Sequence, residues 1–152
     1  MSTKTLKLKI VTPERLVFEE MVKQVTLPTK EGVIGVLPGH VALVATLASG
    51  EVVADLPALG GNEDPVPFAL TGGFVEVKQV DGVTEVAVLA DYAEPVSEIE
   101  KNIEAARAKA EKLAKEQKNK EDVDFEHFES ELERSITRVK IADKWRNKKY
   151  RM

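Results

Sequence analysis

The chain contains no cysteine and only two histidines among its 152 residues. The missing thiols exclude disulfides, cysteine nucleophiles, iron–sulfur clusters and cysteine-ligated zinc, and two histidines are too few for a histidine-rich metal centre. No apolar run approaches the ~20 residues that a membrane-spanning helix needs. Residues 1–9 lack the apolar core of a signal peptide and the arginines of a transit sequence. We therefore expect a soluble protein that works in the compartment where it is made.

Glycine and proline are both missing from the last 57 residues. All nine glycines lie between Gly32 and Gly82, and all seven prolines lie between Pro13 and Pro95. Because both residue types interrupt helices and mark turns, the change at Pro95 predicts a boundary between two architectures. We expect two domains, residues 1–94 and residues 95–152.

The first domain alternates short apolar runs with turn residues. Leu6, Leu8 and Ile10 alternate with lysines, as in a half-buried strand, and Asp81-Gly82 joins two alternating runs as a hairpin turn does. Such spacing predicts an all-β sandwich or a flattened barrel. The expected strands are 6–10, 16–18, 22–27, 33–36, 41–47, 51–56, 67–70, 74–80 and 83–89. The expected turns are 12–14, 31–32, 38–39, 49–50, 60–62, 72–73 and 81–82, and residues 59–67 are expected to form an exposed loop.

The second domain has helical periodicity. Apolar residues recur at steps of three and four, as in the seam of paired helices, and residues 118–122 have no apolar residue and predict a turn. Asp122 or Asp124 can cap a second helix. We therefore expect an antiparallel two-helix hairpin. The first apolar seam is Val96, Ile99, Ile103, Ala106, Ala110 and Leu113, and the second is Phe125, Phe128, Leu132, Ile136, Val139, Ala142 and Trp145.

Charge is sorted along the second helix. Residues 121–133 carry seven acids and no lysine or arginine, whereas residues 134–152 carry eight lysines and arginines against Asp143 alone. The helix dipole favours this order, but only in the first and last turns. The remaining cations suit either nucleic acid, with Trp145 and Tyr150 stacking on bases, or an acidic protein partner. A hairpin with an alanine-rich seam buries little area, so it can also open towards a competing surface.

No catalytic constellation is present. The sequence lacks the phosphate-binding loop, dinucleotide-binding, zinc-protease and nucleophile-elbow motifs. His40 follows Pro38-Gly39 and is interpreted as a residue that holds the turn, and His127 lies among solvated acids. We expect no catalytic residue and no metal site.

Three segments resemble the epsilon subunit of F-type ATP synthase. The first runs from Glu31 through Gly-Val-Ile-Gly-Val-Leu-Pro-Gly to His40 and on to Leu47, the second is Gly72-Gly-Phe-Val-Glu-Val77, and the third is Val88-Leu-Ala-Asp-Tyr-Ala-Glu94. Their order, their spacing and the β-then-helical layout match the family along essentially the whole chain.

The resemblance implies an N-terminal ten-stranded β-sandwich and a C-terminal two-helix hairpin. It implies a non-catalytic rotor subunit that binds the gamma subunit and the ring of c subunits and couples proton-driven rotation to ATP synthesis. The hairpin would extend into the catalytic head of alpha and beta subunits and inhibit ATP hydrolysis. The protein would lie on the cytoplasmic face of the bacterial inner membrane, as a peripheral protein without insertion.

The resemblance also implies sites for the partner subunits. Thr12 and His40 would contact gamma, and the turn from Glu31 to Val33 would face the c ring, although a polar or acidic residue is common at the position of Val33. An acidic segment of the beta subunits would face a set of basic residues on the second helix. These are Arg134, Arg138, Lys140, Lys144, Arg146 and Lys148.

Some members of the family bind a regulatory ATP through an aliphatic residue, an Asp and an Arg-Ala pair at the start of the hairpin. The nearest match runs from Ile103 and Glu104 to Arg107 and Ala108, with Glu94 upstream and Glu in place of the Asp. No cofactor is required for the implied function. A first-turn acid and a solvated arginine are the structural alternative to this ATP site.

Two other functions remain as alternatives. A β-sandwich binding module with a basic helical tail for nucleic acid would explain the cations but not the three motifs. A carbohydrate-active sandwich enzyme would need paired carboxylates and aromatic platforms in a cleft, yet the only tryptophan, Trp145, lies in the tail.

Overall fold

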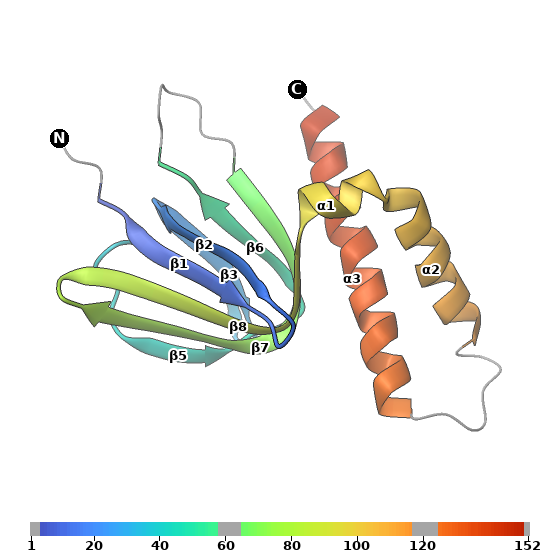
Figure 1. Cartoon of the computed structure of the whole chain (residues 1–152), viewed down its shortest axis with the longest axis horizontal. Coiled ribbons are helices and arrows are strands. Elements are labelled where there is room, and N and C mark those ends of the chain that lie inside the picture. Colours follow the sequence, from blue (N-terminus) through green and yellow to red (C-terminus); the bar gives the residue numbers. More distant parts are fainter. Residues whose placement is uncertain (1–3, 58–64, 117–124, 151–152) are drawn as a thin grey trace. The chain divides into compact units, whose positions relative to one another are not determined.

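The computed structural model describes residues 4–57, 65–116 and 125–150 of the chain. It divides into two compact units, Met1–Pro95 and Val96–Met152. The first contains strands β1 to β8 and the second contains helices α1 to α3 (Figure 1). The strands are β1 (Leu6–Val11), β2 (Leu16–Val22), β3 (Gln24–Thr29), β4 (Gly32–Val36), β5 (Leu43–Thr46), β6 (Gly50–Asp55), β7 (Pro65–Val80) and β8 (Val83–Pro95). The helices are α1 (Val96–Lys101), α2 (Ile103–Glu116) and α3 (Phe125–Tyr150).

The strands form a sheet folded into a sandwich around the long β7–β8 ribbon. The hydrogen-bonded order is β2-β1-β8-β7-β6-β3-β4, with β5 paired to β7, and β1 and β8 are parallel neighbours. Residues 65–70 of β7 pair with β6, and residues 74–77 pair with β5. The ribbon therefore belongs to both layers, one completed by β5, β1 and β2 and the other by β6, β3 and β4.

Period-2 alternation directs one side chain in two into the space between the layers. Leu6, Leu8 and Ile10 of β1 are fully buried, while the lysines between them are not. The rings of Phe18 and Phe68 meet edge to face with centroids 5.1 Å apart, a favoured aromatic geometry. The buried core consists of Leu6, Leu8, Ile10, Val22, Val25, Leu27, Val36, Leu47, Val52, Ala54, Phe68, Leu70, Val75, Val77, Val86, Val88, Ala90 and Ala93.

The Asp81-Gly82 hairpin is confirmed. Val80 pairs with Val83, and the two turn residues have φ of 50° and 81°, the left-handed values that a two-residue hairpin turn needs. The turn expected at Gly72-Gly73 is wrong, because both glycines lie inside the continuous strand β7. Because the expected strands 67–70 and 74–80 are one strand, the nine strands expected from the sequence pattern become the eight that the described residues contain, and this number differs from the ten that the family resemblance implies.

Gly73 is required by close approach of the neighbouring strand. It has φ of 106°, and a Cβ there would lie 2.1 Å from the carbonyl oxygen of Leu89 and 2.8 Å from the Cα of Ala90. These are backbone atoms that cannot rotate away. We expect Gly73→Ala to lower the free energy of unfolding by about 3 kcal/mol, measured by urea denaturation. Gly35→Ala is the control, because no atom lies within 4 Å of its added Cβ, and equal denaturation midpoints for the two variants would contradict this account.

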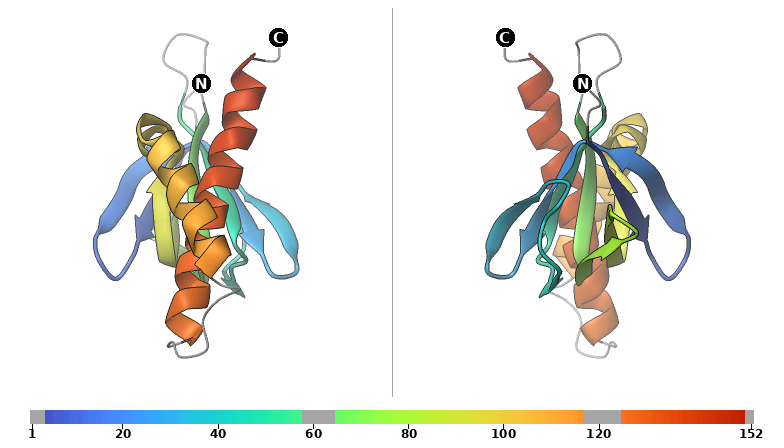
Figure 2. Two further views of the ribbon diagram at one scale, coloured as in Figure 1. Left: turned by 90° about the vertical axis from the view of Figure 1, so that its right-hand side faces the viewer. Right: turned by 90° about the vertical axis from the view of Figure 1, so that its left-hand side faces the viewer.

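The described residues of the helical unit form three helices, where a hairpin of two was expected. Asn102 interrupts the first predicted helix, where its N–H donates to the carbonyl of Ile99 at 3.0 Å, a bond that tightens the turn. Helices α2 and α3 lie side by side (Figure 2). The turn predicted at residues 118–122 lies outside the described residues.

Among the side chains that the structure describes, the buried face of α3 differs from the predicted seam at several positions, because Thr137 and Ile141, which lie outside that seam, are also buried. Ser135 is 3% exposed, whereas Ile136 is 48% exposed. Steps of four, three and four from Phe128 lead to Leu132, Ser135 and Val139, the spacing of a helix seam. Hydrophobicity alone selected Ile136, but the ~100° rotation per residue places it on the flank of the helix beside the seam.

Candidate functional site

A row of apolar side chains crosses the outer face of the sandwich. Val11 pairs with Leu16 of β2 and with Leu89 of β8, and Leu89 pairs with Phe74 of β7. Residues directly opposite in a sheet project to the same side. Leu16, Leu89 and Phe74 are exposed by 51%, 53% and 55%. We call Leu16, Val11, Leu89 and Phe74 the apolar row. Val11 between them is half-buried, and contiguous apolar surface of this kind is a candidate interaction site.

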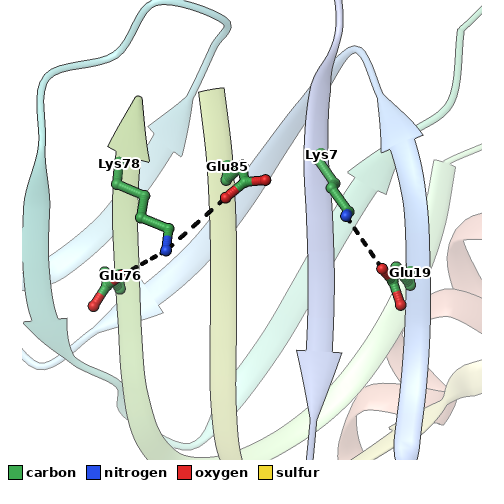
Figure 3. A network of polar contacts seen from close by, with 5 residues as sticks. All are labelled: Lys7, Glu19, Glu76, Lys78 and Glu85. Atoms are coloured by element: carbon green, nitrogen blue, oxygen red, sulfur yellow. Dashed lines mark ion pairs between the residues drawn. The ribbon is translucent and has the colours of Figure 1, made fainter. Parts of the chain in front are cut away.

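The same face carries ion pairs beyond the apolar row (Figure 3). Lys7 Nζ lies 3.3 Å from Glu19 Oε1, and Lys78 Nζ lies 3.8 Å from Glu76 Oε1 and 4.0 Å from Glu85 Oε2. All five side chains are about a third to a half exposed, so each pair contributes at most ~1 kcal/mol to stability. The face is thus divided into an apolar half and a charged half.

The Thr12 turn lies at one end of the apolar row. The Thr12 Oγ1 accepts bonds from the N–H groups of Glu14 and Arg15 at 3.3 and 3.2 Å, and the Thr12 N–H donates to the Arg15 carbonyl at 2.9 Å. These bonds fix the return from β1 to β2. Beside the turn is a pocket of about 190 Å³. It is lined by Thr12, Glu14, Arg15, Asp91, Tyr92, Ala93 and Glu94.

The turn from Glu31 to Val33 protrudes between β3 and β4. The Thr29 Oγ1 donates to the Gly32 carbonyl at 2.5 Å and accepts from the Glu31 N–H at 3.3 Å, which holds the turn in shape. Glu31 is exposed, and Val33 is 72% exposed. Both residues are therefore available to a partner.

The His40 turn is fixed to the β7–β8 hairpin. The Gly39 N–H donates to Thr84 Oγ1 at 2.7 Å, and Gln79 Nε2 donates to the His40 carbonyl at 2.7 Å. The His40 side chain contacts the neighbouring Val41 carbonyl at 2.7 Å through Nδ1. This supports the interpretation of His40 as a residue that holds a turn.

Thr12 and His40 are not brought together. Thr84 holds the His40 turn, whereas Leu89 pairs with the residue before Thr12. Five residue steps of β8 separate these two points, or about 17 Å at ~3.3 Å per residue. A partner that contacts both residues must extend along the strands.

The residues of the expected ATP site are divided between the two units. Glu94 lies on β8, lines the pocket and accepts a hydrogen bond from the Tyr92 hydroxyl. On α2, Glu104, Arg107 and Ala108 are exposed and Ile103 is half-buried. Within the helical unit, Arg107 Nη2 lies 2.5 Å from Asp143 Oδ1 of α3. A nucleotide that uses Arg107 must therefore compete with Asp143.

The basic residues of α3 are not one uniform band. Lys140, Lys144 and Arg146 are exposed, whereas Arg134 and Arg138 are half-buried. The side chain of Lys148 lies outside the described part of the structure. The exposed three are the residues best placed to meet an acidic partner.

Sequence reasoning missed the apolar row and the partner of Arg107. Phe74 occupies the same phase of β7 as the charged Glu76 and Lys78, so its outward position was available from the alternation. Asp143 was visible as the single acid of a basic segment. Its pairing with Arg107, 36 residues away, was not available from local pattern.

The described residues contain no group of three or more His, Asp or Glu side chains able to hold a metal ion. In the described residues, none of the helices combines the length and apolar character needed to cross a bilayer.

Comparison with known proteins identifies the family. Residues 5–96 match the family model described as ATP synthase, Delta/Epsilon chain, beta-sandwich domain. The ATP synthase epsilon chain of Halalkalibacterium halodurans is 38% identical over 140 residues, covering 91% of this chain and 97% of the relative. That of Aliarcobacter butzleri is 45% identical over 105 residues, covering 68% and 79% of the two chains.

Solved structures share the fold. A chain of the Euglena gracilis mitochondrial ATP synthase, from its OSCP/F1/c-ring assembly, has a TM-score of 0.56 at 22% identity, with 91% of this chain and 81% of that chain covered. A chain of the Tetrahymena thermophila mitochondrial ATP synthase central stalk and c ring has a TM-score of 0.53 at 18% identity, with 95% and 98% covered. The resemblance inferred from the sequence motifs is confirmed, and the chain belongs to the family of ATP synthase epsilon chains.

Proposed function

We propose that this chain is the non-catalytic epsilon subunit of an F-type ATP synthase, a part of the central rotor that couples rotation to ATP synthesis. The observation that carries the proposal is the apolar row on a sandwich of this family. Leu89 and Phe74 are both more than half exposed on a rigid sheet. A permanent rotor subunit needs such a surface, because burial of apolar area supplies most of the free energy of stable association.

The gamma subunit is the partner assigned to the outer face. A partner lying along the strands from Thr12 to His40 would cover the apolar row between them. The protruding turn with Glu31 and Val33 is assigned to the c ring. Val33 offers that ring an apolar contact in place of a charged one.

The helical unit is proposed to inhibit ATP hydrolysis when it opens and extends into the head of alpha and beta subunits. Within the described residues, the buried cluster between α2 and α3 consists of three side chains, Leu113, Phe128 and Leu132, and the two helices also share the exposed pair of Arg107 with Asp143. An exposed pair contributes at most ~1 kcal/mol. A competing surface that buries the same apolar side chains would offset the loss of this contact. In this proposal, the eight strands described above are this chain's version of the ten-stranded sandwich that the family resemblance implies. Its three helices are likewise the version of the two-helix hairpin.

A regulatory ATP remains a secondary proposal. Glu104, Arg107 and Ala108 lie on the exposed side of α2. If ATP takes Arg107 from Asp143, it changes the contact between α2 and α3.

As a subunit of the ATP synthase, the chain would lie at the membrane surface, as a peripheral protein on the cytoplasmic face of the bacterial inner membrane.

The proposal is tested by adding the full chain to the epsilon-free catalytic complex from the same source and measuring ATP hydrolysis. We expect saturable binding with a fall in hydrolysis rate. A chain that neither binds nor inhibits would contradict the assignment, and binding to bare RNA or DNA would then favour the nucleic-acid alternative.

The exposed cations of α3 give a further prediction. Replacing Lys140, Lys144 and Arg146 by Gln should weaken inhibition about five- to ten-fold at low salt, because the cations would meet an acidic surface of the beta subunits. Binding to gamma should not change. The measurement is the concentration of chain that halves the hydrolysis rate.

A matched variant replaces three exposed cations elsewhere on the helical unit. Lys101, Lys109 and Lys112 lie on α1 and α2, and their replacement by Gln should have little effect. Equal losses in the two triple variants would show that net charge alone, and not the surface of α3, determines inhibition.

A further inference from the structure

The pocket beside the Thr12 turn adjoins the apolar row. Thr12 directly follows Val11, and Arg15 directly precedes Leu16. Asp91 follows Leu89 by two residues on β8, the spacing that places two side chains on the same face of a strand. The pocket is thus a continuation of the surface assigned to the rotor partner.

The size of the pocket limits its occupant. Its volume of about 190 Å³ lies below the ~300–1,000 Å³ of sites for drug-sized ligands. A nucleotide does not fit such a space, whereas the end of one long side chain does. The occupant is therefore a side chain of the protein that covers the apolar row.

The charge of the lining selects a cation. Glu14, Asp91 and Glu94 contribute three carboxylates, and Arg15 contributes one positive charge, so the lining has a net charge of −2. The Tyr92 hydroxyl donates to Glu94, which orients that carboxylate. A basic side chain entering here would be attracted by the net charge and would make charge-assisted hydrogen bonds.

Gly72 positions one of the carboxylates. It has φ of +60°, and a Cβ at this position would lie 2.3 Å from Asp91 Oδ2 and 3.3 Å from Asp91 Cγ. The carboxylate of Asp91 therefore lies over the bare backbone of Gly72, in space that any other residue would fill. The absence of a side chain at residue 72 thus leaves room for this carboxylate close to the sheet.

From this continuity, size and charge we infer that the pocket receives a lysine or arginine side chain of the gamma-type rotor partner, next to the apolar row. The inference rests on the proposed function, because it requires that partner to bind the outer face. The apolar row supplies most of the affinity, and the pocket fixes the register of the partner along the strands and accelerates association.

The test compares binding of full-length variants to the epsilon-free complex that contains gamma but no c ring. Asp91→Asn combined with Glu94→Gln removes two charges and keeps the side-chain shapes. We expect roughly ten-fold weaker binding at low salt, and a difference that vanishes at high salt. Glu14→Gln alone, at an exposed position, should give a smaller loss of affinity. Its affinity still tests the inference if the double variant is destabilised.

The matched control replaces two exposed acids of the sandwich outside the pocket. Glu20→Gln combined with Asp81→Asn changes the net charge equally, and Asn accepts the positive φ of residue 81. This control should bind like the unmodified chain. If control and pocket variants lose affinity equally, the effect is one of overall charge and the inference is wrong.

The remaining outcomes separate the inference from the proposed function. If the pocket variants bind the gamma complex with unchanged affinity and salt dependence, the pocket inference fails while the proposed function stands. A loss seen only when the c ring is present would assign the occupant to the ring and also overturn the inference. If the unmodified chain does not bind at all, the proposed function itself fails.

Discussion

Phe74→Glu is expected to weaken binding of the chain to the gamma-containing complex by at least ~100-fold. Phe74 is 55% exposed at one end of the apolar row and stands directly opposite Leu89. A large aromatic side chain that becomes fully buried in an interface can contribute ~2 kcal/mol or more. Glutamate removes that contribution and also places a charge where water is excluded. The measurement is the dissociation constant of the labelled full chain.

The matched control for Phe74→Glu is Met21→Glu. Met21 is 43% exposed on the same face, but it pairs with Lys7 in the charged half. Its substitution should change affinity less than about five-fold. Circular dichroism should show folded protein for both variants, since neither residue belongs to the buried core. Similar losses for the two variants would contradict the assignment of binding energy to the apolar row.

Cross-linking α2 to α3 is expected to remove inhibition while leaving rotor binding intact. Arg107 and Asp143 form an ion pair between these helices, and the chain has no native cysteine. Cysteines introduced at both positions can therefore be joined selectively by a short bismaleimide. The cross-linked helices cannot separate, so we expect at least ten-fold weaker inhibition of ATP hydrolysis at unchanged affinity for the gamma complex.

The control for the cross-link joins two positions of one helix. Glu111→Cys and Lys115→Cys lie one turn apart on α2, and a link between them leaves α2 free to move away from α3. This variant should inhibit like the unmodified chain. Full inhibition by the chain linked between residues 107 and 143 would show that inhibition needs no opening of the helices.

The sequence predicted those local features of the fold that depend on a specific short motif. Asp81-Gly82 predicted its hairpin because few residue pairs accept two successive positive φ values. Gly72-Gly73 was misread as a turn, since the reason for Gly73 is the approach of Leu89 and Ala90 from another strand. Close approach between distant residues leaves no mark in the local pattern.

The candidate site was predictable only in part. The family resemblance selected Thr12, Glu31 and His40, and the structure shows each of them in or beside a hydrogen-bonded turn. The apolar row required the strand register, because its members come from β1, β2, β7 and β8. The pairing of Arg107 with Asp143 likewise required the register of α2 on α3, which is set by side-chain packing and not by sequence spacing.

In the proposed function, the sandwich binds the gamma subunit of the rotor. This binding is tested most directly with the labelled full chain and two purified assemblies, one with alpha, beta and gamma subunits and one with alpha and beta alone. We predict tight, saturable binding to the assembly that contains gamma and none of comparable strength to the other. Equal binding to both assemblies, or binding to neither, would contradict the account.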